Sequence, residues 1–444
     1  MTTDYRMIAD DLAEAIKAGR MKPGEKLLPQ REFAYQHHVA ASTAGRVYGE
    51  LTRRGLVSGE VGRGTFVKRS PSPSNAALLD IRESTVNLEL VYPLLDDHRP
   101  ILSAAVADLA ASPAFVDALA PIGATPSPAA RNIAARFLSQ QGWSPQPSQI
   151  LFAGNGKQAI AAALSALAPP GSRIGIEALT YPVVKYLASQ LRIELVPIDI
   201  DDQGMSARAL DKVLARGRLA AVYVQPSIHN PTAATMSVER RKAVADVLKA
   251  RGVTAIEDGV YRFLVDEIPL AAFAPNYVIL IDSLSKRLAA GLGLGLIACP
   301  DRLVRDLASS IRRGVWMPVG LPLANGLHWM ASDTLSEFVA QKRRDAQLRQ
   351  RIARSALKAL NPAGDERAYH LWLRLPDHWR AESFVAAALR RGIALTPGSA
   401  FAAQSGHAPN CVRVALASPA PPVLRRALED VAELASTAEE IELE

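Results

Sequence analysis

Cysteine is scarce in this sequence. The 444 residues contain two, Cys299 and Cys411. Two cysteines cannot build the disulfide framework of a small secreted domain, and neither lies in a CxxC pair or in a Cys/His cluster with the spacing of a zinc site. The sequence therefore excludes a disulfide-rich scaffold, and we predict no metal site.

Long apolar runs are also missing. No segment approaches the roughly 20 consecutive apolar residues that a membrane-spanning helix requires. The first residues, MTTDYRMIADDLAEAIKAG, are amphipathic and contain acidic side chains, unlike a secretory signal peptide. Apolar residues still make up 49% of the chain, enough to bury a large core in two or three domains. These features predict a cytoplasmic protein that does not partner with a membrane.

The net charge of +7 is unevenly distributed. Residues 1–70 contain 12 Lys and Arg against 8 Asp and Glu, whereas the rest of the chain contains 39 against 36. A local basic excess is typical of proteins that bind a polyanion, although a solvated basic face produces the same count. Charge alone therefore does not identify the first seventy residues as a DNA-binding domain, and a structural argument is needed.

The pattern of these residues supplies that argument. Apolar residues at helical spacing predict three short helices, at 4–19, 30–36 and 42–55. Ser42 is a suitable N-cap for the third helix. Two β-branched runs, at 56–58 and 65–68, flank a turn with three glycines and predict a two-stranded wing. Three helices followed by a hairpin predict a winged helix-turn-helix.

Particular motifs carry a family resemblance. The segment KLLPQREFA, followed by VAASTAGRVYGELTRRGLV and GRGTFV, resembles the GntR-type DNA-binding domain over residues 1–70. Its third helix would enter the major groove of a double-stranded DNA operator. Family members usually have Ser-Arg in place of Ala40-Ala41 and Pro in place of Leu28, so one DNA contact is missing here. The residues that we expect to contact DNA are Arg31, Ser42, Thr43, Arg46, Arg63, Gly64 and Thr65.

A linker follows this domain. The stretch RSPSPSNAALLD, residues 69–80, is rich in proline and serine and lacks periodicity. We place the linker at residues 71–85, between a DNA-binding domain of residues 1–70 and a large domain of residues 86–444.

The large domain alternates helical patterns with short apolar runs. The predicted strands lie at 174–176, 195–200, 220–224, 254–256 and 278–281. Such alternation predicts an α/β fold with a mostly parallel sheet and helices on both faces. Ligands of these sheets bind beyond the carboxyl ends of the strands. The polar clusters QPSIHNPT, EDGVY and DSLSK follow three of the predicted strands, so we expect the ligand site there.

Pyridoxal 5'-phosphate fits the residue types in these clusters. It requires an amine to form an imine, a carboxylate to keep its ring nitrogen protonated, a donor for its phenolic oxygen, an aromatic face and a phosphate cradle. The motifs resemble fold-type I aminotransferases of the aspartate aminotransferase class across roughly residues 100–435. The resemblance implies that Lys286 forms the internal aldimine, that Asp258 pairs with the pyridine nitrogen, and that Asn230 and Tyr261 hydrogen-bond the phenolic oxygen.

The same resemblance assigns further residues. Tyr181 would stack on the pyridine ring, and Arg413 would clamp the α-carboxylate of an effector in a bidentate pair. The glycine-rich turn GNGKQAI opens a helix whose amides would receive the phosphate. The residues implied in the phosphate cradle are Asn155, Gly156, Lys157, Ser283 and Ser285.

Each of these residues has a simpler explanation when taken alone. Lys286 could be a lysine at the start of a helix, Asp258 a helix N-cap and Tyr181 a core residue. The run GLGLG resembles part of a dinucleotide-binding fingerprint, but the helix start and acidic residue do not follow at the required spacing. The order of the motifs in one register favours the aminotransferase interpretation.

One departure concerns the phosphate. The family usually has an arginine at the position of Gly293, so a charge-assisted contact worth roughly 1.5–3 kcal/mol is lost and retention of the cofactor is in doubt. Lys157 and Arg287 could replace it, and we favour Lys157 because it lies in the phosphate-binding turn. A second departure is Ala233 in place of the usual glycine of NPT-containing loops, which we expect to tighten the loop near Asn230.

The combination of a GntR-type domain and an aminotransferase-like domain resembles the MocR subfamily of bacterial transcriptional regulators. This resemblance implies a head-to-tail homodimer and a large domain that senses an effector, either a B6 vitamer or a small amino compound. We expect attachment of pyridoxal phosphate to Lys286, or its transfer to an amino compound held by Arg413, to alter the packing of the linker.

Two alternatives stay open from the sequence. One is a working pyridoxal-phosphate-dependent aminotransferase with an accessory helical domain, because the amine, the ring-nitrogen acid and the carboxylate clamp are all present. The other is a large domain that has lost the cofactor and binds another ligand or only mediates dimerisation.

Overall fold

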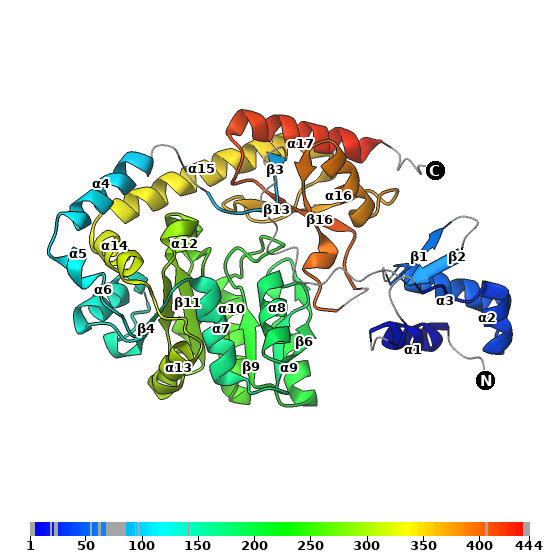
Figure 1. The fold of residues 1–444 in the computed structure, drawn as a ribbon, viewed down its shortest axis with the longest axis horizontal. Helices are drawn as coiled ribbons and strands as arrows, with labels where there is room; N and C mark the ends of the chain where they lie inside the picture. Colours follow the sequence, from blue (N-terminus) through cyan, green and yellow to red (C-terminus); the bar gives the residue numbers. More distant parts are fainter. Residues whose placement is uncertain are drawn as a thin grey trace. The chain divides into compact units, whose positions relative to one another are not determined.

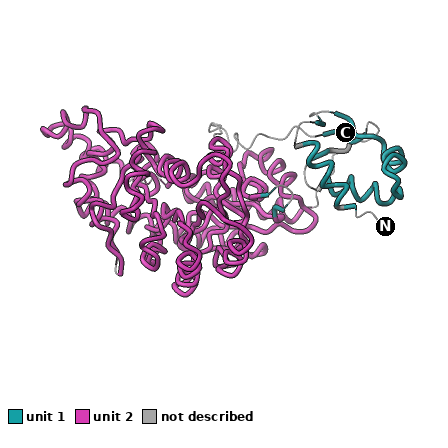
Figure 2. The backbone as a smooth tube through the Cα atoms, turned by 90° about the horizontal axis from the view of Figure 1, so that it is seen from below, with its two compact units in different colours: residues 1–79, 404–408 teal, residues 80–403, 409–444 magenta. Residues whose placement is uncertain are grey.

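A computed structural model describes residues 5–17, 20–21, 25–53, 56–60, 64–67, 86–93, 95, 98–140, 142–404 and 407–437 of the chain. The chain forms two compact units, one of residues 1–79 with 404–408 and one of residues 80–403 with 409–444 (Figure 2). The predicted linker at 71–85 lies outside the described residues, so the predicted domain boundaries stay predictions.

The smaller unit consists of three helices and a hairpin. Its elements are α1 (Tyr5–Lys17), α2 (Gln30–Gln36), α3 (Ala41–Arg53), β1 (Val57–Glu60) and β2 (Gly64–Val67). The two strands are antiparallel, with Val57 opposite Val67. The helices form because their apolar residues recur at three- and four-residue spacing, as Ala44, Val47, Tyr48 and Leu51 do on the buried face of α3. The predicted winged helix-turn-helix is confirmed.

The predicted N-cap of α3 is wrong. Thr43 N and Ala44 N both donate to Ala40 O, at 2.9 and 3.0 Å, so Ala40 precedes the helix and Ser42 is its second residue. The carbonyl at residue 40 therefore starts the helix, and the Ser42 hydroxyl is left exposed on its first turn. The wing is also shifted, because Gly64 begins β2 instead of belonging to the turn.

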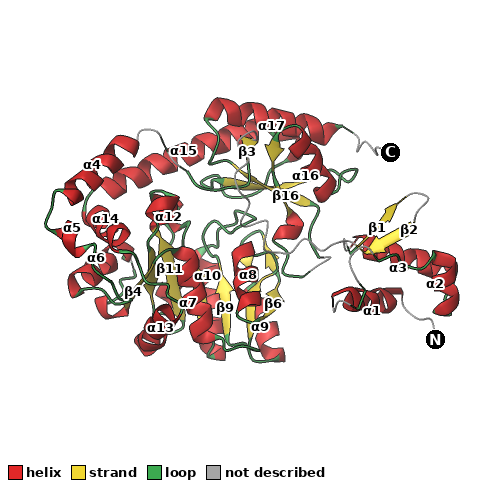
Figure 3. Ribbon diagram, in the orientation of Figure 1, coloured by secondary structure: helices red, strands yellow, loops and turns green. Residues whose placement is uncertain are grey.

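The larger unit is built on a seven-stranded sheet, which Figure 3 shows enclosed by helices. In spatial order its strands are β4 (Ile150–Ala153), β12 (Gly295–Ala298), β11 (Val278–Ser283), β10 (Ala255–Asp258), β9 (Ala221–Val224), β5 (Arg173–Glu177) and β6 (Glu194–Ile198). All neighbours are parallel except β12, which runs antiparallel to both β4 and β11. The predicted, mostly parallel sheet is confirmed.

Alternate residues of each strand enter cores on opposite faces of the sheet. Phe152 and Leu280 pack on one face, whereas Leu151 and Ile281 pack on the other. The first face is covered by α6 (Pro128–Leu138), α9 (Ala207–Arg216), α10 (Val238–Arg251), α11 (Leu270–Phe273), α14 (Gly320–Ala331) and part of α15 (Thr334–Ala356). The second is covered by α7 (Gly156–Leu167), α8 (Pro182–Gln190) and α13 (Asp301–Arg313).

The predicted run at 195–200 is divided in the structure. Strand β6 ends at Ile198, and β7 (Ile200–Asp201) turns back to pair with β8 (Gly204–Met205). The sequence interpretation also missed β4 and β12, which are apolar runs of only four residues each.

A second, smaller layer lies at the top of the large unit in Figure 1. It contains the antiparallel strands β13 (His370–Arg374), β16 (Cys411–Ala415) and β15 (Thr396–Pro397), with α16 (Ala381–Arg390) and α17 (Pro421–Ser436). Strand β14 (Ile393–Ala394) pairs in parallel with β3 (Val86–Asn87). Further helices are α4 (His98–Ala110), α5 (Ala114–Asp117) and α12 (Leu284–Arg287). In the part of the chain that the structure describes, no helix is both long and apolar enough to cross a bilayer.

Candidate functional site

The first turn of α7 and the start of α12 lie against each other. Asn155 is the N-cap of α7, and its Oδ1 accepts a hydrogen bond from Gln158 N at 3.0 Å. A Cβ atom at Gly156 would lie 3.1 Å from Ser283 Cβ, so glycine permits the approach. The Ser283 hydroxyl accepts a hydrogen bond from Ser285 N at 3.2 Å and lies 3.0 Å from Ser285 Oγ. These groups gather at the N-terminal end of α7, where N–H groups without helical partners favour an anion.

Lys286 stands one residue further along α12. Its Nζ donates a hydrogen bond to Val91 O at 2.5 Å and lies 3.4 Å from the centroid of the Tyr92 ring and 5.7 Å from that of Tyr261. Burial, followed by the positive charges nearby, lowers the pKa of Lys286 well below its ordinary value. A lower pKa increases the share of neutral amine at neutral pH, and the neutral amine is the form that attacks a carbonyl carbon.

Asp258 ends β10 and is 2% exposed. Its Oδ2 accepts hydrogen bonds from Tyr223 OH at 2.6 Å and from Gln225 Nε2 at 3.3 Å, and its Oδ1 accepts one from Val260 N at 3.2 Å. These donors are neutral. Burial raises the pKa of Asp258, and the hydrogen bond from Tyr223 opposes that effect. A buried carboxylate held by neutral donors is suited to pair with a cationic ring nitrogen.

Arg413 lies in the middle of β16 and is buried. Its Nη1 donates to Asn230 Oδ1 at 2.9 Å, and its Nη2 donates to Glu89 O and, at 3.4 Å, to Thr396 Oγ1. The guanidinium carbon lies 4.9 Å from the Phe401 ring centroid. Among the described residues, Nε of Arg413 has no hydrogen-bond partner although it is buried. An unsatisfied buried donor on a guanidinium is a place for a carboxylate.

Two tyrosines, Tyr261 and Tyr181, are also among the predicted residues of this site. Tyr261 is buried, with its ring 5.6 Å from that of His370. Tyr181 is the residue before α8. Burial raises the pKa of Tyr181 well above its ordinary value, and the phenols of Tyr92 and Tyr261 add to the effect. Both predicted tyrosines are therefore neutral donors at physiological pH.

Gly293 borders the predicted phosphate cradle. A Cβ atom at this position would lie 2.9 Å from Ser285 Oγ and 3.3 Å from Asn155 Cβ. Lys157, the second residue of α7, is exposed beside the same turn. Its charge is one of those that lower the pKa of Lys286. A cation at residue 157 is therefore near the site even though residue 293 supplies none.

Arg287 serves a different purpose. It is buried, its Nη2 lies 2.5 Å from Asp282 Oδ2, and its guanidinium stacks near the rings of Phe137 and Phe263. A second buried arginine, Arg262, approaches the same carboxylate at 3.6 Å. Arg287 is thus held in a buried ion pair, which leaves Lys157 as the stronger of the two proposed substitutes.

The loop after Asn230 has a strained backbone position. Ala233 adopts a φ of 55°, in the left-handed region that favours glycine. Its N–H donates to His229 O at 2.6 Å and its carbonyl accepts from Asp365 N at 2.9 Å. The alanine that replaces the usual glycine therefore adopts the left-handed conformation that glycine favours, and the expected tightening of the loop stays a prediction.

The sequence interpretation missed several residues of this site. Glu89, Val91 and Tyr92 contact Arg413 and Lys286 but follow the linker without a recognisable motif. Lys342 was also missed: its buried Nζ donates to Lys286 O at 2.9 Å and to Leu288 O at 2.6 Å. These contacts fix the end of α12 on which Lys286 stands.

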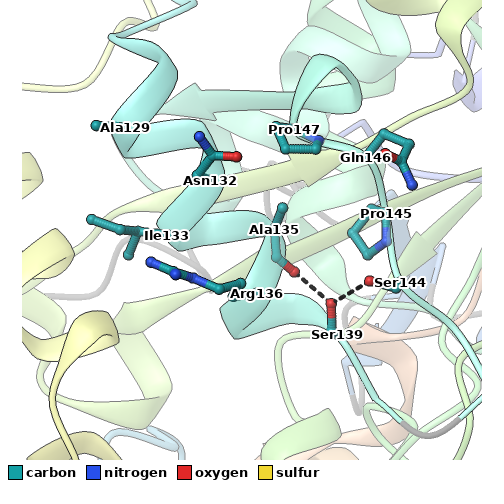
Figure 4. A pocket seen from close by; sticks show the side chains of 10 residues that line it. All are labelled: Ala129, Asn132, Ile133, Ala135, Arg136, Ser139, Ser144, Pro145, Gln146 and Pro147. Carbon is teal, nitrogen blue, oxygen red and sulfur yellow. Dashed lines mark hydrogen bonds between the residues drawn. The ribbon is translucent and has the colours of Figure 1, made fainter.

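A separate concavity lies on α6 (Figure 4). Ser139 Oγ donates to Ala135 O at 2.8 Å and lies 2.8 Å from Ser144 Oγ. Proline and glutamine at 145–147 form the opposite wall. None of the predicted site residues lines it, so it is distinct from the site around Lys286.

The predicted DNA-contacting residues lie on two helices and on the wing. Arg31, in α2, and Ser42 and Arg46, in α3, are exposed. The Arg46 guanidinium lies 4.2 Å from the Tyr5 ring centroid, which holds it close to α1. Thr43 is partly buried, and Gly64 and Thr65 begin β2. Arg63 lies outside the described residues.

Comparison with known families accounts for both units. Residues 97–431 match the family model of aminotransferase class I and II. Residues 4–67 match the model of bacterial regulatory proteins of the gntR family. The chain belongs to the GntR-type regulators that carry an aminotransferase domain. This combination is consistent with the MocR subfamily and confirms the resemblance found in the motifs.

Relatives with the same architecture are regulators. The HTH-type transcriptional regulator YdeF of Bacillus subtilis is 31% identical over 96% of this chain and 95% of its own length. The vitamin B6 salvage pathway transcriptional repressor PtsJ of Salmonella typhimurium is 27% identical over 89% of this chain and 90% of its own. This regulator is therefore similar, over nearly its whole length, to proteins named for transcriptional control.

The large unit also resembles solved aminotransferases. The α-aminoadipate aminotransferase LysN of Thermus thermophilus, complexed with N-(5'-phosphopyridoxyl)-L-leucine, has a TM-score of 0.72 and 20% identity, over 80% of this chain and 92% of its own. The likeness shows the fold, and this fold family depends on pyridoxal phosphate. The residues of this regulator fit that group: an amine with a lowered pKa, a buried carboxylate with neutral donors, and the glycine-lined start of α7 lie in one site.

Proposed function

We propose that this regulator senses pyridoxal 5'-phosphate, or its adduct with an amino compound, through covalent attachment at Lys286. The observation that carries the proposal is the setting of the Lys286 amine, which burial makes less basic and which shares its surroundings with buried Asp258 and Arg413. An aldehyde ligand needs such an amine. The name of the relative PtsJ, a vitamin B6 salvage repressor, supports the same class of ligand.

The chain's own residues have distinct tasks in this proposal. Asp258 would keep a ring nitrogen protonated, and Asn230 and Tyr261 would donate to the phenolic oxygen. Tyr181 would cover the ring face. Asn155, Gly156, Lys157, Ser283 and Ser285 would hold the phosphate. Arg413 would bind the carboxylate of an amino compound, because its Nε is unsatisfied.

The output of the proposed sensor is DNA binding. The exposed Arg31, Ser42 and Arg46, with Thr43, Gly64 and Thr65, would contact a double-stranded operator, together with Arg63. Because operators of such regulators present paired half-sites, we propose a head-to-tail homodimer that acts in the cytoplasm. Occupancy of the site would change the geometry of the linker and thereby the affinity for paired half-sites.

An absorption spectrum with added pyridoxal phosphate tests the covalent part. We expect a Schiff-base band in the wild type that is lost in K286A and retained in K358A, a control at an exposed lysine of the same unit. DNA affinity, measured on fragments selected from a random pool, should respond to the ligand in the wild type and much less in K286A. An equal response in K286A would refute sensing through Lys286.

A working aminotransferase is the second candidate. The observation that favours it is the unsatisfied Nε of Arg413 beside a reactive lysine, which is what an amino-acid substrate needs. Steady turnover of an amino acid with a 2-oxo acid acceptor, at about 1–10³ per second, would establish it. If protein that shows the Schiff-base band has no turnover, the result favours the sensor over the aminotransferase.

A further inference from the structure

The first residues of the large unit form a strap, residues 86–93, whose first part is anchored in a sheet. Val86 N donates to Gly392 O at 2.8 Å and Leu88 N to Ala394 O at 3.0 Å, which places β3 beside β14. Leu88 is fully buried in the core of the smaller layer. The anchored part therefore has both hydrogen-bonded backbone and apolar burial.

A turn then directs the strap towards the site. Asn87 Oδ1 accepts hydrogen bonds from Glu89 N at 3.0 Å and from Leu90 N at 2.9 Å. Such an Asx turn reverses the chain over a few residues. Beyond it, residues 88–93 belong to no strand or helix. Movement of the strap beyond Asn87 would break no sheet ladder, but it would break the hydrogen bond that Ser418 Oγ donates to Leu90 O at 3.0 Å and uncover Val91, which is buried in an apolar cluster.

The part of the strap that follows Asn87 contacts both cations of the site. Glu89 O accepts from Arg413 Nη2, and Val91 O accepts from Lys286 Nζ at 2.5 Å. The Tyr92 ring covers the same ammonium at 3.4 Å. Burial raises the pKa of the Glu89 carboxyl group, and the positive charge of Arg413 opposes that rise. One short segment thus satisfies the amine and the guanidinium together.

A ligand must take these same donors. A carboxylate can bind a guanidinium in a bidentate pair in two ways, through Nη1 and Nη2 or through Nε and Nη2. Both ways use a hydrogen of Nη2. Nη2 of Arg413 is engaged by Glu89 O and by Thr396 Oγ1. Thr396 is fixed opposite Arg413 in the sheet, whereas Glu89 is not in a sheet. A carboxylate that pairs with Nη2 therefore competes with Glu89 O of the strap.

Covalent attachment removes the second contact. The neutral Lys286 amine adds to the aldehyde carbon, one water leaves, and a carbon–nitrogen double bond replaces both N–H bonds of the amine. The donor that Val91 O accepts from is then lost. The cation over which the Tyr92 ring lies is lost with it in the unprotonated imine.

We propose that the strap is an internal competitor for the ligand: occupation of Lys286 and Arg413 releases residues 89–92 while residues 86–88 stay anchored. This inference rests on the proposed function and identifies how the site is regulated. The strap continues directly into residues 71–85, the predicted linker. Ligand binding thereby changes the segment through which the two units are joined.

Hydrogen exchange followed by mass spectrometry tests the release. With pyridoxal phosphate and a carboxylate that carries no amino group, such as maleate, as the probes for Lys286 and Arg413, we expect exchange at the Glu89 and Leu90 amides to rise at least tenfold, with little change at Leu88, and a smaller rise in K286A. The Schiff-base band is recorded on the same samples. If the band appears without faster exchange, only the proposed release of the strap is overturned. If the band is absent, the covalent part of the proposed function is overturned as well.

A variant that loosens the strap provides a second test. Asn87→Ala removes the acceptor of the Asx turn without touching the residues assigned to the ligand. We expect it to bind pyridoxal phosphate several-fold more tightly than the wild type, because the competitor is weakened. Asn132→Ala, at an exposed asparagine of α6, is the matched control and should bind as the wild type does. Unchanged or weaker binding by Asn87→Ala would contradict competition.

Discussion

Restoring a cation at residue 293 should strengthen the hold on a phosphate. Gly293 has a φ of −64° and a ψ of 129°, which an arginine adopts without strain. The Cβ atom of an arginine would lie 2.9 Å from Ser285 Oγ, a hydroxyl that can rotate, and 3.4 Å from Ala290 O. The substitution Gly293→Arg is therefore sterically feasible and aims a guanidinium at the cradle.

The size of the effect follows from two opposing contributions. A charge-assisted hydrogen bond to the phosphate contributes about 1.5–3 kcal/mol. Ordering a long side chain costs about 1.5–2 kcal/mol. The difference between the midpoints of these ranges is about 0.5 kcal/mol, which corresponds to about twofold tighter binding at 25 °C. Lys157 is exposed, so its own contribution is smaller, about 0.2–1 kcal/mol.

The assay must separate this contact from the covalent bond. We would compare the dissociation constants of pyridoxal phosphate for K286A and for K286A/G293R by equilibrium dialysis, with pyridoxal as the ligand that lacks the phosphate. Tighter binding of pyridoxal phosphate alone is expected, and K157A should weaken binding less in the presence of the new arginine. An equal gain for pyridoxal, or no gain for either ligand, would show that residue 293 does not face the phosphate.

Two other predictions concern stability. Burial lowers the pKa of Lys342 from 10.5 to about 7. The unfolded chain therefore binds more protons between these pH values, so the contribution of Lys342 to stability is present above pH 10.5 and is lost as the pH falls towards 7, with a slope of up to about 1.4 kcal/mol per pH unit. Urea unfolding of the large unit at pH 7, 8.5 and 10 should show a flatter dependence in Lys342→Met, and an unchanged slope would rule out this titration. In the smaller unit, Tyr48 OH donates to Leu28 O at 2.6 Å, so Tyr48→Phe should lower the free energy of unfolding of that unit by about 0.5–1.5 kcal/mol. Calorimetry should detect the loss in the transition of the smaller unit only, and a shift in both transitions would contradict it.

The sequence predicted most where local pattern determines structure. Helix α2 has the bounds that its pattern indicated, because its buried side chains, Phe33 and Ala34, belong to a short apolar stripe. The glycine turn at Asn155 opens α7 as expected, because its side chain caps the helix. The predicted strands at 174–176 and 278–281 coincide with β5 and β11, because apolar β-branched runs favour buried strands.

The rest depended on contacts between distant residues. Strand β12 is antiparallel in a mostly parallel sheet, and nothing in Gly295–Ala298 indicates its direction. Arg287 follows Lys286 directly in the sequence, but only the fold shows that Arg287 forms an ion pair with Asp282. The contact of Val91 with Lys286 joins residues 195 positions apart and involves a backbone carbonyl, so no pattern of side chains could predict it.

The hydrophobic cores of the two units have no member in common. In the described residues, the core around Phe33, Val47 and Leu51 ends at Val67, and the next core residue along the chain is Leu88. Each unit consequently has its own source of folding free energy. The smaller unit would therefore keep its fold whether or not the larger unit holds a ligand. Any effect of such a ligand on DNA binding would act through the segment between the units, without unfolding the smaller unit.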